Sequence, residues 1–245
     1  MSPLGPQALQ TYYTDIMENY QTFPTSPTVA TVTERNRVLR NTYWLLALSM
    51  VPTVIGAYIG VATGIASAMS PGISMVVFLA GAFGFMFAIE KTKNSSAGVP
   101  VLLGFTFFMG LMLSRLVGSV LGLSNGASLI MTAFAGTGVI FLGMASLSSV
   151  IKRDLTSMGK WLFIGVIMLL VAGIANFFIQ SSALMITLSV LAIGIFSAFI
   201  LHDLKRVQDG LETNYITATL GVYLSIYNVF QALLSLLGIF GSRDE

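Results

Sequence analysis

The sequence predicts an all-α polytopic membrane protein with seven transmembrane helices. Only 9% of the 245 residues are charged and 55% are hydrophobic, whereas a soluble domain carries about 25% charged residues. The mean hydropathy is +0.85. Seven separate runs also reach the roughly 20 apolar residues that a membrane-spanning helix needs. Most of the folded surface must therefore face lipid.

The apolar runs divide the chain into a tail and a membrane domain. Residues 1–40 are polar and lack the basic-then-apolar start of a cleaved signal peptide, so we expect a largely disordered tail. Residues 41–245 form the membrane domain. The expected spans are 43–66, 72–90, 99–121, 127–150, 160–180, 183–201 and 216–240.

Basic residues predict the orientation of these spans, because cytoplasmic loops carry an excess of Lys and Arg. Loops 67–71, 122–126 and 181–182 carry none. We therefore expect a cytoplasmic N-terminus and, after seven spans, a C-terminus on the outer side. The bases that alternate in this way are Arg35, Arg37, Arg40, Lys91, Lys93, Lys152, Arg153, Lys160, Lys205 and Arg206.

Small residues predict where the helices pack closely, because lipid gives helices no hydrophobic reason to associate. We expect such contacts on the first, second and fourth spans. The residues concerned are Gly56, Gly60, Gly64, Ala80, Gly84, Gly136, Gly138 and Gly143.

The last span is predicted to be the central helix. At 100° per residue, one side carries a small or polar stripe and the other carries Tyr223 and Tyr227. A helix that is polar on two sides is a poor neighbour for lipid, so the other spans should surround it. The stripe consists of Gly221, Ser225, Asn228, Ala232 and Ser235.

Polar groups at depth are the candidate functional residues, because they are costly in a membrane. Arg115 lies roughly 9 Å from the outer end of the third span. Its side chain either extends to the interface or serves a buried ion pair or a pore. For Asn228 an interhelical hydrogen bond competes with a role in an ion pathway.

His202 and Asp203 follow the sixth span at its expected cytoplasmic end. We expect His202 to be an interfacial residue. Asp203 has two open interpretations: a solvated charge at the rim, or a carboxylate that faces the last span and titrates or binds a cation. About 100° of helix separates the two residues, so a shared inward direction is not expected.

The inventory of side chains argues against an enzyme. The chain has no Cys and a single His, which excludes thiolate chemistry and leaves no ligand cluster for a metal. No glycine-rich nucleotide-binding loop is present. We therefore expect no catalytic residues, no metal and no cofactor, and the net charge of +2 is too small to indicate nucleic acid.

Three stretches together resemble the Bax inhibitor-1 family, and within it the bacterial YccA-like branch. They are "GFTFFMGLMLS" (104–114), "TAFAGTGVIFLGMAS" (132–146) and "ETNYITATLGVYLSIYNVFQALLSLLGIFGSRD" (212–244), and "VLRNTYWLLALS" (38–49) agrees with the same branch. The resemblance covers about residues 38–245. It implies a seven-helix fold with a central last helix.

The resemblance also implies two alternative functions. The YccA-like branch implies a protein of the bacterial inner membrane that binds and restrains the protease FtsH through its cytoplasmic tail, with Arg35, Arg37 and Arg40 as candidate contacts. Other members are pH-sensitive calcium leak channels with paired acids in the last two helices. Asp203 matches the first acid, but Ser225 stands where the second belongs. Arg115 also replaces a proline that is usual in the family.

Overall fold

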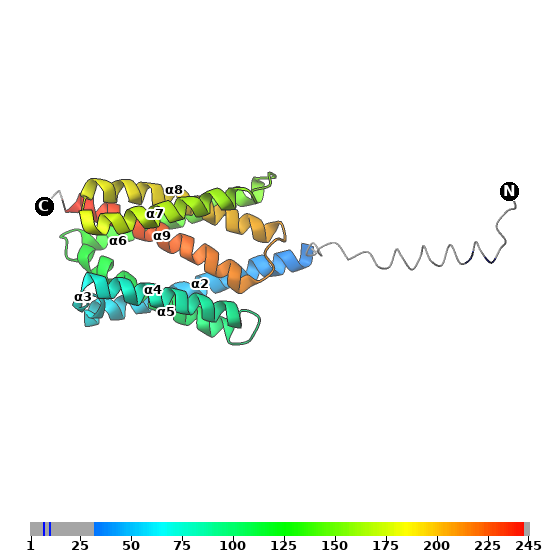
Figure 1. Ribbon diagram of the computed structural model, residues 1–245, viewed down its shortest axis with the longest axis horizontal. Coiled ribbons are helices and arrows are strands. Elements are labelled where there is room, and N and C mark those ends of the chain that lie inside the picture. Colours follow the sequence, from blue (N-terminus) through cyan, green and yellow to red (C-terminus); the bar gives the residue numbers. More distant parts are fainter. Residues whose placement is uncertain (1–6, 8–9, 11–31, 243–245) are drawn as a thin grey trace. The chain divides into compact units, whose positions relative to one another are not determined.

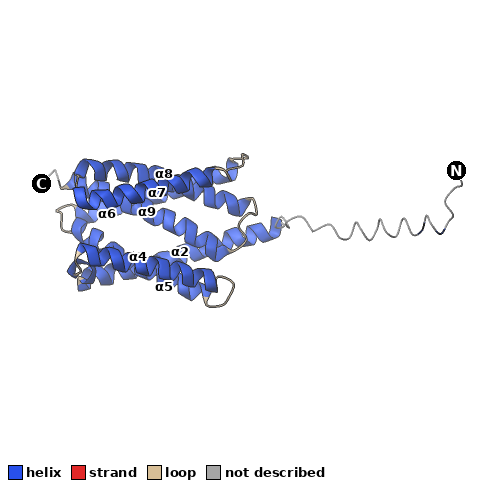
Figure 2. Ribbon diagram, viewed as in Figure 1, coloured by secondary structure: helices blue, strands red, loops and turns tan. Residues whose placement is uncertain are grey.

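The computed structural model describes residues 7, 10 and 32–242. Residues 32–242 are almost entirely helical and contain no strand (Figures 1 and 2). Seven of the helices are long and apolar enough to cross a membrane. The helices are α2 (Val32–Thr63), α3 (Ile65–Ala68), α4 (Pro71–Thr92), α5 (Gly98–Leu121), α6 (Gly126–Val150), α7 (Met158–Ile179), α8 (Ser182–Gln208) and α9 (Tyr215–Gly241).

The helix ends agree with the expected spans to within about three residues, except at two places. α2 begins at Val32 rather than near residue 43, and α8 continues to Gln208 rather than ending at residue 201. Both extensions are polar. Hydropathy detects the part of a helix that faces lipid, whereas the backbone hydrogen bonds of a helix continue into water. Of the predicted tail at residues 1–40, residues 32–40 form the first turns of α2. Residues 1–31 lie outside the described residues, apart from positions 7 and 10.

The closest helix packing lies between α2 and α5. A β-carbon on Gly56 would overlap the backbone oxygen of Phe107, and one on Gly60 would overlap the side chain of Ser114. From the other side, a β-carbon on Gly110 would overlap the backbone oxygen of Thr53. The two backbones therefore approach each other at positions where only glycine fits.

The other predicted small-residue contacts are mostly wrong. Gly64 ends α2 in a left-handed conformation (φ 66°) and does not extend the stripe. Gly84, Gly138 and Gly143 have open space where a β-carbon would lie, and Gly136 makes only an ordinary contact with Leu233. Ala80 is exposed. On α4 it is Gly81, against the ring of Phe108, that permits a close approach.

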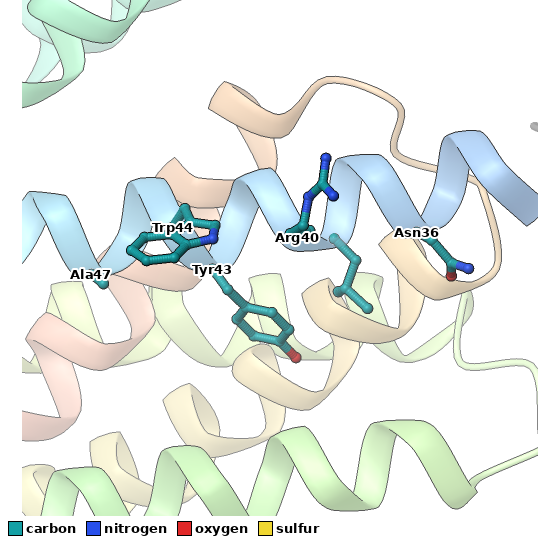
Figure 3. Close-up of a pocket in the computed structure, with 6 residues that line it drawn as sticks. Asn36, Arg40, Tyr43, Trp44 and Ala47 are labelled. Carbon is teal, nitrogen blue, oxygen red and sulfur yellow. The ribbon is translucent and has the colours of Figure 1, made fainter.

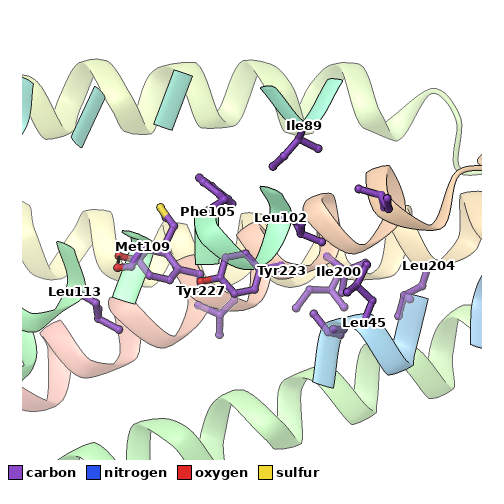
Figure 4. Packing of buried hydrophobic residues seen from close by; sticks show 14 residues of the cluster. Leu45, Ile89, Leu102, Phe105, Met109, Leu113, Ile200, Leu204, Tyr223 and Tyr227 are labelled. Atoms are coloured by element: carbon purple, nitrogen blue, oxygen red, sulfur yellow. Dashed lines mark hydrogen bonds between the residues drawn. The ribbon is translucent and has the colours of Figure 1, made fainter. Parts of the chain in front are cut away.

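α9 is the central helix, as predicted. It lies between the group of α2, α4 and α5 and the group of α6 and α8, and contacts all five (Figure 1). Tyr223 and Tyr227 are buried in the hydrophobic cluster drawn in Figure 4. The Tyr223 hydroxyl pairs with the Thr53 hydroxyl (2.9 Å), and the Tyr227 hydroxyl donates to the Met109 carbonyl (3.3 Å).

Hydrogen bonds across loops join helices in two sets at one end of the bundle, α4 with α9 and α2 with α6 and α8. Asn214, which caps α9, donates to the Lys93 carbonyl after α4 (3.1 Å), and Arg35 of α2 donates to the Gln208 carbonyl of α8 (2.9 Å). Gln208 in turn donates to Ser148 of α6 (2.8 Å). We call this the basic end, because the ten bases of the alternating loops lie at the helix termini here. Met69 lies at the opposite end.

The contact between α2 and α5 makes a prediction about stability. Gly56→Ala and Gly110→Ala each force two backbones apart and should lower the free energy of unfolding by about 1–3 kcal/mol. Gly84→Ala, with open space around the same new atom, is the matched control and should leave the thermal midpoint unchanged or slightly higher. Thermal unfolding of the purified protein in detergent measures all three. Equal midpoints for Gly56→Ala and Gly84→Ala would contradict the packing argument.

Candidate functional site

His202 lies inside the bundle, so the prediction of an interfacial histidine is wrong. The residue is only 6% exposed. Because α8 continues to Gln208, His202 is held within a regular helix and packs against α7. A β-carbon on Gly159 would lie 2.8 Å from Nε2 of His202, and the ring of Phe199 meets the imidazole edge to face.

Asp203 adopts the inward one of its two predicted positions. A β-carbon on Gly221 would lie 2.8 Å from Oδ2 of Asp203, so the carboxylate rests directly on the backbone of α9. Its other oxygen, Oδ1, lies 3.1 Å from Nδ1 of His202. The two side chains thus meet each other, although His202 packs against α7 and Asp203 against α9.

The two predicted polar residues of α9 bond within their own helix. The Ser225 hydroxyl donates to the Gly221 carbonyl (3.1 Å), and the Asn228 amide donates to the Leu224 carbonyl (2.7 Å). The interhelical bond expected of Asn228 is therefore replaced by a local one. α9 contains no acidic residue, so it offers Asp203 no second carboxylate with which to share a proton.

The three predicted partner-binding arginines differ in their surroundings. Arg35 is half-buried and bonded to α8, whereas Arg37 and Arg40 are exposed and have no ion pair with any described residue. Arg40 lines a hollow of about 550 Å³ along α2, together with Tyr43 and Trp44 (Figure 3). Trp44 is 73% exposed. An exposed cation beside two aromatic rings suits a membrane interface or a protein partner.

Arg115 lies apart from these residues, near the opposite end of the bundle. Its side chain is exposed, and Nη1 donates to Ser74 Oγ (3.2 Å) and to the Met69 carbonyl (3.4 Å). Both partners belong to the start of α4 and the turn before it, so the side chain extends toward this end of the bundle. Arg115 forms no ion pair with the described residues.

The chemistry available around His202 and Asp203 is that of a proton or a cation. Nδ1 of His202 and Oδ1 of Asp203 face each other, and no hydroxyl among residues 32–242 forms a hydrogen bond with either side chain. Within the described residues, no group of three His, Cys, Asp or Glu residues is close enough to hold a metal ion.

Several residues that organise these sites were not singled out from the sequence. Gly159 gives His202 its space, Gln208 joins Arg35 to α6, and Gln231 lines a cavity with Arg115. A glycine near the start of a predicted span gives no signal for a histidine packed 43 positions later. Of these three residues, only Gln231 carried a signal in the sequence, because an amide inside an expected span is costly.

The fold and the buried residues define a multi-pass membrane protein built around its own last helix, with its charged groups gathered mainly at one end. Residues 35–242 match the family described as "Inhibitor of apoptosis-promoting Bax1". The chain belongs to this family.

The chain is also similar to individual membrane proteins of bacteria. It is 38% identical over 211 residues (86% of this chain and 93% of the relative) to an "Uncharacterized membrane protein" of Vibrio cholerae. It is 35% identical over 209 residues (85% and 92%) to the "Modulator of FtsH protease YccA" of Escherichia coli K12. The same identity and coverage relate it to the "Inner membrane protein YccA" of another Escherichia coli strain.

The contact between His202 and Gly159 predicts that the two positions are energetically coupled. Gly159→Ala crowds the imidazole and His202→Ala removes it, so each single change should lower the thermal midpoint. In the double variant the added methyl group occupies the space left by the imidazole. The loss of stability in the double variant should therefore be smaller than the sum of the losses in the two single variants by at least about 0.5 kcal/mol. Gly173→Ala on the same helix, with open space around it, is the control. Additive effects of Gly159→Ala and His202→Ala would disprove the contact.

Proposed function

We propose that this chain binds and restrains an FtsH-type membrane-anchored protease, as a non-catalytic protein of the bacterial inner membrane. The observation that carries the proposal is the 35% identity, over 85% of the chain, to a relative named modulator of FtsH protease. A second relative at the same identity is named an inner membrane protein.

The packing of α2 suggests how such a protein restrains a protease. A protease that extracts membrane proteins pulls on a free end, and here residues 1–31 precede α2 directly. The pull therefore acts first on the helix whose glycines Gly56 and Gly60 bring it closest to α5. Moving α2 also separates the Tyr223 hydroxyl from Thr53. A substrate that resists extraction in this way occupies the protease without being degraded.

The surface at the start of α2 is the proposed contact region. Arg37 and Arg40 are exposed on the first turns of α2, directly after the tail, and the hollow beside Arg40 is continuous with the exposed ring of Trp44. The distribution of bases supports a cytoplasmic basic end and a C-terminus on the outer side. The tail and the two arginines then face the side on which a cytoplasmic protease domain would work.

Removal of residues 1–31 tests the proposal. In proteoliposomes with FtsH, ATP and a second membrane substrate, the full chain should slow degradation of that substrate. The truncated chain should lose this effect and should itself be degraded more slowly, because the protease has no end to pull. Inhibition that is unchanged after truncation would refute the proposed role of the tail.

A pair of glycine variants separates binding from resistance to extraction in the same assay. Gly56→Ala keeps the tail but loosens α2, so it should be degraded faster than the wild type and inhibit for a shorter time. Gly84→Ala should behave as the wild type does. If both variants are degraded at the wild-type rate, packing of α2 does not limit extraction.

The inward position of Asp203 favours a second candidate function, a pH-sensitive cation (calcium) leak controlled through this carboxylate. A carboxylate that rests on the central helix is placed to attract a cation or a proton. The pairing of Asp203 with His202, and the Ser225 hydroxyl in place of an acid, distinguish it from a shared carboxylate pair.

A flux measurement tests the second candidate. Calcium-loaded liposomes that contain the purified chain should lose calcium at a rate that changes with pH, and Asp203→Asn should change that pH dependence. Ser119→Asn, an exposed residue near the opposite end, serves as the control substitution. A rate no higher than that of empty liposomes at every pH would eliminate the leak function.

A further inference from the structure

A cavity near the opposite end of the bundle has a polar side and an apolar side. It measures about 220 Å³ and lies between α4, α5 and α9. Arg115, Ser74 and Gln231 supply polar groups to it, and Tyr227 also lines it, with its hydroxyl bonded to the Met109 carbonyl. Its apolar wall comes from Met75, Phe78 and Met112. None of these residues belongs to the basic end or to the His202–Asp203 pair.

The guanidinium of Arg115 has donors to spare in this cavity. It carries five N–H donors, and only Nη1 is engaged, in two long bonds of 3.2 and 3.4 Å. The amide of Gln231 makes no hydrogen bond to any described residue. The carboxylates of residues 32–242 lie in other parts of the fold and form no ion pair with Arg115. The cavity is therefore positive, rich in donors and without a described anion.

The depth of Arg115 places these donors near the phosphates of a bilayer. A 24-residue helix such as α5 is about 36 Å long, a little more than the roughly 30 Å hydrocarbon core. Arg115 lies six residues before the end of α5 at Leu121, so its Cα is about 6 Å inside the core. Its side chain then extends to the layer of lipid headgroups.

We propose that this cavity binds the phosphate group of an anionic phospholipid in the leaflet at the opposite end of the bundle. A guanidinium beside an amide and a hydroxyl matches the oxygens of a phosphate. The wall of Met75, Phe78 and Met112 suits the glycerol and the first acyl carbons. A single uncompensated positive charge favours phosphatidylglycerol over phosphatidylcholine, whose ammonium would add repulsion. A free phosphate offers the same oxyanion chemistry but gains nothing from the apolar wall.

Native mass spectrometry of the full chain in detergent tests the site. The protein is given equal amounts of phosphatidylglycerol and phosphatidylcholine, and the ratio of the two lipid adducts is measured. The wild type should retain phosphatidylglycerol preferentially, and Arg115→Gln should lower the ratio about fivefold. Arg37→Gln, an exposed arginine at the basic end, should leave most of the preference intact. Equal ratios for the wild type and Arg115→Gln would overturn the proposal.

A second variant keeps the test decisive if Arg115→Gln does not fold. Gln231→Glu preserves the shape of the side chain but places a carboxylate in the cavity, so it should lower the ratio as Arg115→Gln does. Gln180→Glu adds the same charge at the exposed end of α7 and should not. A ratio that Gln231→Glu leaves unchanged would contradict the site. Displacement of phosphatidylglycerol by millimolar inorganic phosphate would assign the cavity to a free anion instead of a lipid.

Discussion

Close contact between the backbones of α2 and α5 is the constraint on which the rest of the bundle depends. Lipid gains nothing when two apolar helices associate, so association requires dispersion contacts at short range and hydrogen bonds. Gly56 and Gly110 allow the two backbones to meet from both sides. With the helices this close, Thr53 of α2 and the Thr106 carbonyl of α5 both reach the Tyr223 hydroxyl of α9 (2.9 and 3.4 Å). The contact between α2 and α5 therefore also positions the central helix α9.

At the basic end the helices are held together by hydrogen bonds, whereas in the middle of the bundle they are held together by close packing. Water competes for hydrogen bonds at this end, yet Arg35 and Gln208 connect α2, α8 and α6, and Asn214 connects α9 to the end of α4. His202 and Asp203 lie just inside this layer. His202 packs against Gly159 of α7 and Asp203 against Gly221 of α9, which leaves the His202 side chain 8% exposed and the Asp203 side chain 18% exposed. A polar pair thus lies between the hydrogen-bonded end of the bundle and its closely packed interior.

The proposed protease contact and the proposed lipid site use different ends of the bundle. The first depends on the end of the chain that precedes α2 and on the resistance of α2 to displacement. The second depends on Arg115, which is bonded to the start of α4 and has no ion pair with the residues described. A bound phospholipid would connect α4, α5 and α9 where the protein itself supplies few polar contacts between them.

The sequence alone determined the number of spans, their approximate ends and the central position of α9. These follow from local properties: the length of an apolar run, and a helix that carries polar residues on two sides. Only the tertiary structure decided that Asp203 faces α9, that His202 is buried against Gly159, and which glycines form contacts. Gly56 and Gly84 look equivalent in the sequence, yet one meets a backbone and the other meets open space. The reason is physical, because the direction of a side chain and the distance to its neighbour are set by helices far away in the chain.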